Sequence, residues 1–138
     1  MNTEEYKAKM GEKIAVLQRI NENLLSQYEA INSKEIAILG KLAKRQQKNI
    51  DRLNRINGIL REVKDFDRTS DLRQYETDTD SLLKAAIQAN KMNISAAEEL
   101  KNASGRELYR LRINGKAIKN GYFNMDSQQN GYFIDKRK

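Results

Sequence analysis

The chain of 138 residues contains no cysteine, no histidine and no proline, and it has only seven glycines. Without cysteine there is neither a disulfide framework nor thiol chemistry, and without histidine the commonest general base and metal ligand is missing. Acid–base catalysis would have to rest on carboxylates, lysine or tyrosine. Because proline is absent and glycine is sparse, long helices meet few interruptions.

Hydrophobic runs long enough to cross a membrane are also missing from the sequence. The first residues, Met1 to Lys7, lack the charged-then-apolar order of a secretory signal. We therefore expect a cytoplasmic protein with no membrane insertion.

The residues that dominate the sequence are Lys, Glu, Gln, Asn, Ala, Leu and Ile, a mixture typical of helices. The length fits one domain with a single modest core. We expect an all-α fold, an elongated antiparallel bundle of about three long helices with a flexible C-terminal tail. In this interpretation residues 1–119 form the helical bundle and residues 120–138 form an aromatic, basic tail.

Apolar residues recur every three or four positions through the first half of the chain, which is a heptad-like pattern. The first stripe consists of Met10, Ile14, Leu17, Leu24, Tyr28 and Ile31, with Asn21 in the one vacant slot. It resumes at Ile38 and Leu42, beside a second line through Ile36, Leu39, Ala43, Ile50, Leu53, Ile56 or Asn57, Leu60 and Val63. Between the two, Asn32-Ser33-Lys34-Glu35 has the pattern of a capping box, which predicts a helix–helix turn. The alternative is one continuous helix, because nothing between Tyr28 and Ile38 forces a break.

The helical period is lost over residues 66–72 and 76–81, where Asp, Ser and Thr gather, and we expect the main loop there. A last long helix follows, with Leu83, Ala86 or Ile87, Asn90, Ile94, Ala97, Leu100 or Lys101, Ser104, Leu108, Leu111, Gly115 and Ile118 on one stripe. Asn90 and Ser104 would need hydrogen-bond partners if they were buried. We expect this helix to fray at Asn114-Gly115 or to end at Asn120-Gly121.

The formal net charge of +7 is unevenly distributed along the chain. Residues 34–64 carry nine basic against three acidic side chains, residues 65–80 two against six, and the segment from Arg106 onward eight against three. The basic side chains of the first of these segments lie mostly on one helix flank: Lys41, Lys44, Arg45, Lys48, Arg52 and Arg55. Clustered cations can bind phosphates. Since no reader motif is present and few aromatics lie among them, we interpret the run as a solvated face and expect no nucleic-acid binding.

Catalytic constellations are not evident in the sequence. Asp78 and Asp80 are two residues apart and Glu98 and Glu99 are adjacent, so neither pair faces one site from a helix. No phosphate-binding glycine motif or nucleophile with a nearby base occurs. We expect a protein that is not an enzyme and that has no cofactor and no metal.

The last nineteen residues contain the same four residues twice, Asn120-Gly121-Tyr122-Phe123 and Asn130-Gly131-Tyr132-Phe133. Two of the three Phe and two of the six Tyr of the chain lie here. Exposed aromatic side chains tend to mark contact sites, so the pattern indicates a partner-binding segment. The alternative is a tail that folds back and fills a gap in its own core.

The layout as a whole resembles the flagellar export chaperones of the FlgN type. The residues that carry the resemblance are Leu39 to Gln47 in the opening helix pair, the acidic loop, Lys116-Ala117-Ile118-Lys119, and the ending Tyr132 to Lys138, which looks like the ending of Gram-positive members. The resemblance covers essentially the full length, and the tail is its most specific part. The duplicated Asn-Gly-Tyr-Phe is not part of the family pattern.

The resemblance implies a cytoplasmic chaperone that binds hook-filament junction proteins (FlgK/FlgL-like) and delivers them to the export apparatus for type III secretion. It implies that the C-terminal part holds the client, which assigns partner binding to the apolar positions Leu108, Leu111, Ile118, Tyr122, Phe123, Tyr132, Phe133 and Ile134. Two alternatives stay open, a FliT-like chaperone for the filament cap protein and a structural coiled-coil protein that forms a homo-oligomer.

Overall fold

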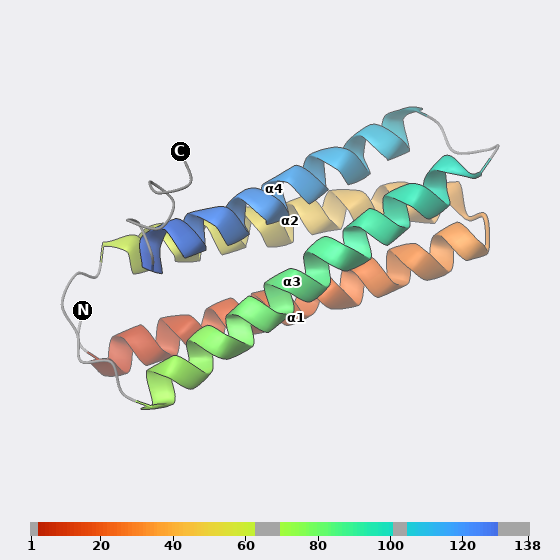
Figure 1. The fold of residues 1–138 in the computed structure, drawn as a ribbon. Coiled ribbons are helices and arrows are strands. Elements are labelled where there is room, and N and C mark those ends of the chain that lie inside the picture. The colour runs from red at the N-terminus through yellow and green to blue at the C-terminus, as the bar shows by residue number, and fades with distance from the viewer. Residues whose placement is uncertain (1–2, 63–69, 101–104, 130–138) are drawn as a thin grey trace.

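The computed structural model describes residues 3–62, 70–100 and 105–129, and for residues 70–71 and 121–129 it describes the main chain alone. These residues form four helices and no strand (Figure 1): α1 (Thr3–Asn32), α2 (Ile36–Arg61), α3 (Ser70–Glu98) and α4 (Gly105–Gln129). The expected all-α class is therefore confirmed for this part of the chain. At a rise of about 1.5 Å per residue each helix is roughly 37 to 45 Å long.

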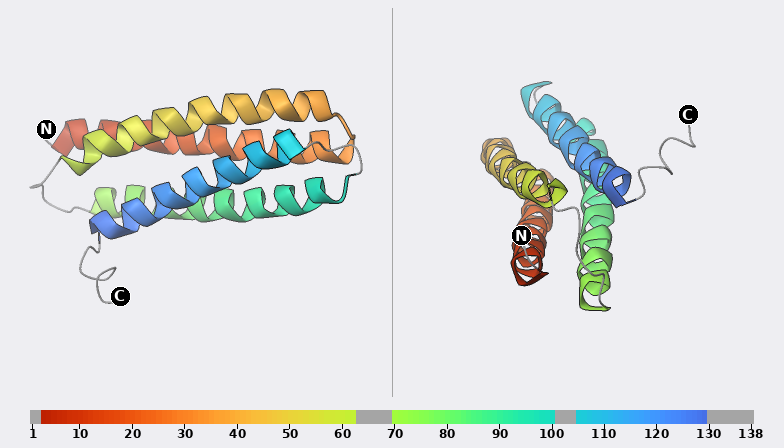
Figure 2. Two further views of the ribbon diagram at one scale, coloured as in Figure 1. Left: turned by 90° about the horizontal axis from the view of Figure 1, so that it is seen from above. Right: turned by 90° about the vertical axis from the view of Figure 1, so that its left-hand side faces the viewer.

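The four helices pack so that each has two neighbours. α1 contacts α2 and α3, and α4 contacts α2 and α3, whereas the described residues of α1 and α4, and those of α2 and α3, do not pack together. Figures 1 and 2 show that α1 and α3 run in one direction and that α2 and α4 run in the other. Two antiparallel hairpins, α1–α2 and α3–α4, thus lie against each other with their parallel helices adjacent.

The turn between α1 and α2 lies where the sequence predicts it, but its chemistry is different. The N–H of Glu35 donates to the carbonyl of Ala30 (2.8 Å) and the N–H of Lys34 donates to that of Ile31 (3.0 Å), the pair of bonds that defines a Schellman motif. Lys34 has φ 59, in the left-handed region. Glu35 caps α2 without a side-chain hydrogen bond, so the expected capping box is wrong, as is the continuous helix.

The expected loop over residues 70–81 is wrong, because α3 already begins at Ser70. Leu72 and Leu83 are fully buried, and this packing favours the helix. The hydroxyls of Thr77 and Thr79 donate to main-chain carbonyls three or four residues earlier, at 2.9 Å each, within the helix. The rest of the expected loop, residues 66–69, lies outside the described residues.

The last helix of the sequence prediction is divided into two. α3 ends at Glu98 and α4 begins at Gly105, so the stripe from Leu83 to Ile118 belongs to two antiparallel helices. The N–H of Leu100 donates to the carbonyl of Ala97 (3.1 Å), which closes the end of α3 with a tight turn. The described residues therefore form four helices where about three were expected.

The buried apolar residues form two clusters, one toward each end of the packed helices. The larger cluster consists of Tyr6, Met10, Val16, Leu17, Ile20, Leu24, Ile50, Leu53, Ile56, Leu60, Leu72, Leu83, Ala86 and Ile118. The smaller cluster, near the α1–α2 turn, consists of Ala30, Ile31, Leu39, Ala97 and Leu111. The second stripe of the sequence prediction is buried from Leu39 to Leu60, whereas Tyr28 and Ile38 of the first stripe are exposed.

Between the two clusters, all four helices contribute buried amide side chains. This buried amide layer consists of Asn23, Gln27, Gln46, Asn90, Asn93 and Asn114. Its members donate to main-chain carbonyls across every pair of neighbouring helices. The bonds run from Asn93 to Leu24 (α3 to α1, 2.9 Å), from Gln46 to Ile20 (α2 to α1, 3.0 Å), from Asn114 to Ala43 (α4 to α2, 3.1 Å) and from Asn90 to Leu111 (α3 to α4, 3.2 Å).

These bonds bear on the register of the helices. A buried amide without a partner costs roughly 1–3 kcal/mol, so sliding one helix past its neighbour would leave several such groups unsatisfied. The layer therefore favours one alignment of the four helices over alternatives that would bury the same apolar area.

Candidate functional site

Three of the predicted partner-binding residues lie in described parts of α4 and face the interior. Leu111 and Ile118 are 0% exposed and belong to the two apolar clusters. Leu108 is half-buried and packs against the smaller cluster. In this arrangement a partner has no access to Leu111 or Ile118, and their direct role here is packing.

The remaining predicted residues lie toward the end of the chain. Tyr122 and Phe123 are in α4, which continues to Gln129, so the expected helix end at Asn120-Gly121 is wrong. The structure does not describe the side chains of Tyr122 and Phe123. Tyr132, Phe133 and Ile134 lie wholly outside the described residues. The boundary expected between residues 119 and 120 falls within a helix.

The surface of α4 that faces α2 carries apolar side chains that the sequence analysis did not single out. Tyr109 is 57% exposed and Ile113 is 41% exposed, and as i and i+4 neighbours they lie on one face of the helix. Both line a groove of about 310 Å³ between α2 and α4, together with Lys44 and Arg110. The sequence pattern missed them because they fall beside the buried stripe.

A second groove, of about 270 Å³, lies on the opposite side of α4, between α3 and α4. Ile87, Asn90 and Ile94 of α3 contribute to its lining, and Gly115 contributes from α4. A Cβ atom on Gly115 would collide with Nδ2 of Asn90 and would lie 3.8 Å from Cδ1 of Ile94. The absence of a side chain at position 115 is therefore what allows Asn90 to reach α4.

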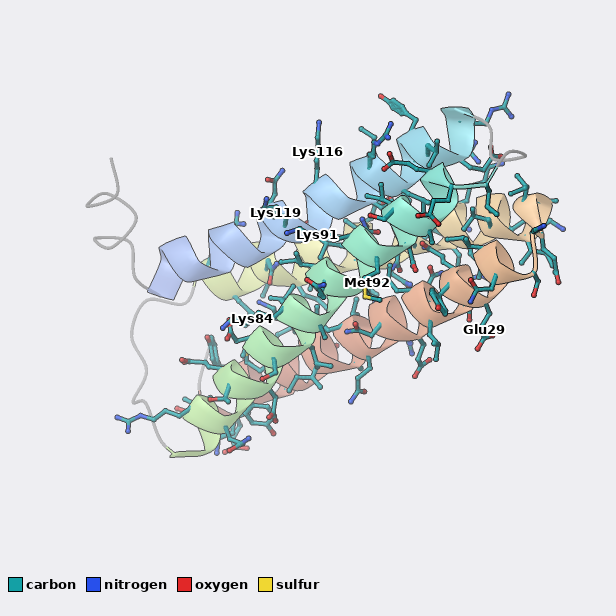
Figure 3. All side chains as sticks on the ribbon, turned by 45° about the vertical axis from the view of Figure 1, so that its right-hand side comes forward. Glu29, Lys84, Lys91, Met92, Lys116 and Lys119 are labelled. Atoms are coloured by element: carbon teal, nitrogen blue, oxygen red, sulfur yellow. The ribbon has the colours of Figure 1, made fainter. Side chains whose placement is uncertain are left out.

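Basic side chains border the groove between α3 and α4. Its lining includes Lys91 of α3 and Arg112, Lys116 and Lys119 of α4. Figure 3 shows Lys91, Lys116 and Lys119 on the α3 and α4 side of the molecule. Arg112 forms an ion pair with Glu98 across the two helices (3.5 Å), whereas no ion pair of Lys91, Lys116 or Lys119 is recorded within the described residues.

Two buried oxygen atoms have no hydrogen-bond donor among the described residues, Oδ1 of Asn90 and Oε2 of Glu107. Asn90 is 2% exposed, and its Nδ2 must face the carbonyl of Leu111 because that atom can only accept. This orientation turns Oδ1 away from the Leu111 carbonyl. The amide of Asn90, one of the lining residues, thus has one acceptor without a donor among the described residues.

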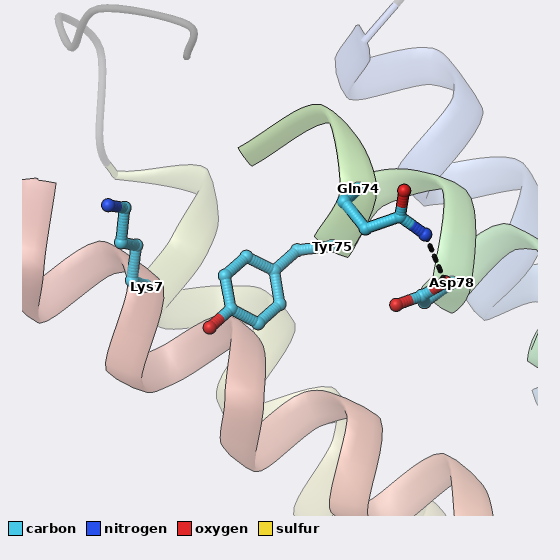
Figure 4. A pocket seen from close by; sticks show the side chains of 4 residues that line it. All are labelled: Lys7, Gln74, Tyr75 and Asp78. Atoms are coloured by element: carbon cyan, nitrogen blue, oxygen red, sulfur yellow. Dashed lines mark hydrogen bonds between the residues drawn. The ribbon is translucent and has the colours of Figure 1, made fainter. Parts of the chain in front are cut away.

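A further groove lies between α1 and α3, lined by Lys7, Gln74, Tyr75 and Asp78 (Figure 4). Nε2 of Gln74 donates to Oδ1 of Asp78 (2.9 Å), a contact within one helix. The ring of Tyr75 extends from α3 toward α1. The hydrogen bond between Gln74 and Asp78 thus stabilises α3 itself.

Lys13 of α1 is almost completely buried, and its pKa is shifted. The pKa of its ammonium group is lowered from 10.5 to about 8, chiefly by burial and to a smaller extent by the positive charge of Arg61. The predicted basic run, in contrast, lies on the surface of α2. Its six side chains are all exposed: Lys41, Lys44, Arg45, Lys48, Arg52 and Arg55.

Within residues 3–62, 70–100 and 105–129, no group of three or more acidic side chains is arranged to hold a metal ion. In the same residues no helix has the length and apolarity needed to cross a membrane. In comparisons with protein-family models, curated proteins and solved structures, nothing matches this chain. The likeness to the FlgN-type chaperones therefore rests on the residue pattern of the chain alone.

Proposed function

We propose that the chain is a flagellar type III export chaperone of the FlgN type, which binds hook-filament junction proteins (FlgK/FlgL-like) in the cytoplasm, prevents their premature assembly and delivers them to the export gate. The observation that carries this proposal is the position of α4, which forms one wall of two surface grooves. The resemblance assigns client binding to the same C-terminal part of the chain.

The two grooves beside α4 are of the type that binds helical segments of a partner protein. Flagellar axial proteins assemble through terminal helices, and an amphipathic helix binds a partner by laying its apolar face in a hydrophobic groove. In the groove between α2 and α4, α4 contributes the exposed apolar side chains of Tyr109 and Ile113. In the groove between α3 and α4, the apolar side chains are Ile87 and Ile94 of α3. A client that orders only on binding loses conformational entropy, which limits its affinity and permits release at the export gate.

A FliT-like chaperone for the filament cap protein would use the same kind of groove. The residues of the tail ending, Tyr132 to Lys138, favour the FlgN type over it. The two are distinguished by the client, so junction protein and cap protein must be offered to the chain in parallel.

The structural coiled-coil oligomer is the less favoured alternative. It requires apolar stripes that pair with another copy, yet Leu17, Leu24, Leu39, Ile50 and Leu53 are all buried within one chain. The stripes are therefore satisfied without a second molecule. Light scattering on dilution would detect an oligomer that persists.

The experiment that tests the proposal is co-purification of the full chain with purified junction proteins, repeated with two truncations. Removal of residues 130–138 leaves every described helix complete, whereas removal of 120–138 also shortens α4 but keeps the buried Ile118. We expect both to keep the circular dichroism of the packed helices and to bind client weakly or not at all. A truncation that unfolds the chain would instead make the tail part of its core, and absence of binding by the full chain would overturn the proposal.

A further inference from the structure

We propose that the groove between α3 and α4 binds an amphipathic helix of a protein partner whose apolar stripe is flanked by acidic residues. The inference rests on the proposed function for the identity of that partner, which would be the client. The chemistry of the occupant follows from the groove itself. No residue of this groove was singled out by the sequence as a partner contact.

The apolar part of the groove has the length of a short helical contact. Ile87 and Ile94 are seven residues apart on α3, with Asn90 between them, so the three share one face over about 10 Å of helix. On α4, Gly115 lines the groove, and the amide of Asn90 fills the space that a side chain at position 115 would take. A partner helix that presents apolar side chains at i, i+3 or i+4, and i+7 would match this spacing over two turns.

The basic side chains on both walls of the groove favour a partner helix with acidic residues on both sides of its apolar stripe. Lys116 and Lys119 follow each other along α4, and Lys91 lies across the groove on α3 (Figure 3). All three are exposed. Acidic side chains beside the apolar stripe of a partner would meet these cations, and complementary charge raises both specificity and association rate. A second copy of this chain fits less well, because each copy carries a net charge of +7.

The amide of Asn90 lies beneath the surface of the groove, where it is 2% exposed and its Nδ2 donates to the carbonyl of Leu111. The accessible part of the groove therefore consists of the isoleucines of α3 and the basic side chains of both helices. The groove thus combines an apolar surface with cationic walls.

The first test uses a fluorescently labelled synthetic peptide of about four helical turns, with Leu at i, i+3 and i+7 and Glu on both sides of that stripe. Fluorescence anisotropy measures its binding to the full-length protein. Two comparison peptides replace either the Glu residues by Lys or the Leu residues by Ser, and a short DNA duplex provides anionic charge without an apolar face. We expect binding of the Leu/Glu peptide alone. Equal or tighter binding of the Ser peptide or of the duplex would overturn the inference, because charge would then suffice.

The second test uses paired charge reversals in the full chain. Lys91→Glu with Lys116→Glu changes the groove, whereas Arg52→Glu with Arg55→Glu makes the same change of net charge on exposed positions of α2. We expect the first pair to weaken peptide binding about tenfold or more and the second by no more than about twofold. Equal weakening by both pairs would contradict the inference, since only the overall field of the protein would then matter. All four positions are exposed, and circular dichroism confirms that both variants fold.

The inference and the proposed function fail in different ways. If the peptide binds the groove but purified junction proteins do not bind the chain, the inference stands and the proposed client is wrong. If junction proteins bind but the groove variants bind them as tightly as the original chain, the inference is wrong and the function stands. Light scattering of the two variants and the original chain completes the test, because an oligomer that only the groove variant disrupts would identify the occupant as a second copy and overturn the inference.

Discussion

Gly115 on α4 provides the space that the side chain of Asn90 on α3 occupies. Nδ2 of Asn90 donates to the carbonyl of Leu111, four residues before Gly115 on the same helix, at 3.2 Å. A Cβ atom at position 115 would collide with that Nδ2. One glycine therefore allows both the close approach of α3 to α4 and the hydrogen bond from Asn90 between them.

Gly115→Ala is expected to destabilise the protein by about 1–3 kcal/mol. The helix itself would gain up to about 1 kcal/mol from the substitution, but the displaced Asn90 amide would remain buried without its acceptor. Chemical denaturation measures the change in the free energy of unfolding.

The matched control is Gly11→Ala, where an added Cβ meets no atom within 4 Å and only the helix propensity changes. It should stabilise the protein by about 0.5–1 kcal/mol. The double variant Asn90→Ala/Gly115→Ala removes the collision, so the two changes should be strongly non-additive. Additive effects would show that Asn90 and Gly115 do not interact.

Lys34→Gly is expected to stabilise the protein by about 1 kcal/mol. Lys34 holds φ 59 at the end of α1, a conformation that costs a side-chain-bearing residue about 1–2 kcal/mol and that glycine adopts freely. Part of the gain is lost because glycine makes the unfolded chain more flexible. Ser33→Gly, one residue earlier, serves as control and should give no gain; an equal gain at both positions would contradict the explanation.

Stability should rise with pH between about pH 8 and pH 10.5 because of Lys13. Its pKa is lowered in the folded protein to about 8, chiefly by burial and further by Arg61, so in this window the unfolded chain binds more protons than the folded one. Lys13 alone would contribute about 2 kcal/mol between pH 7 and about pH 9.5.

The measurement is the difference in unfolding free energy between the original chain and Lys13→Met at each pH, which removes the titration of the other lysines. Arg61→Gln should raise the pKa of Lys13 in the folded protein, because it removes a positive charge that disfavours the protonated form. The rise in stability should then begin at a higher pH. A difference that stays constant from pH 7 to pH 10 would show that Lys13 is not perturbed.

Leu111→Ala should destabilise the fold by about 2–5 kcal/mol, because Leu111 is fully buried and its truncation leaves a cavity. Tyr109→Ala, two residues earlier and mostly exposed, should change stability by less than about 1 kcal/mol. Thermal denaturation distinguishes the two. A small effect at Leu111 would mean that it lies at the surface and is accessible to a partner.

Much of the fold follows from the helical period of the sequence. The buried line from Leu39 to Leu60 and the turn after Asn32 could be predicted, because long apolar periodicity and its interruption are strong signals. The start of α3 could not, since Asp, Ser and Thr favour turns in isolation. Burial of Leu72 and Leu83 outweighs that local preference.

The division of the last predicted helix could not be read from periodicity. One stripe connects Leu83 to Ile118 in the sequence, and two antiparallel helices satisfy it as well as one long helix does. The buried amide layer was equally hidden, apart from the requirement that a buried Asn90 find a partner. Its bonds end on main-chain carbonyls, which have no sequence signature.

The candidate site shows the same limits of sequence reasoning. Apolar positions on α4 were predicted to bind a partner, but the most periodic of them, Leu111 and Ile118, are those that the core buries. Tyr109 and Ile113, which are exposed, lie beside the stripe. Periodicity identifies what a helix buries, and a binding surface is found among the residues that remain outside.

The most direct test of the proposed chaperone is a titration of the isotope-labelled full chain with a purified hook-filament junction protein, followed by NMR. Saturable binding is predicted, with the largest amide shift changes in residues 120–138 and in α3 and α4 around Lys91, Gly115 and Lys116. Absence of any change at concentrations on the order of 100 μM, where interactions of useful affinity saturate, or changes confined to α1 and α2, would contradict the account.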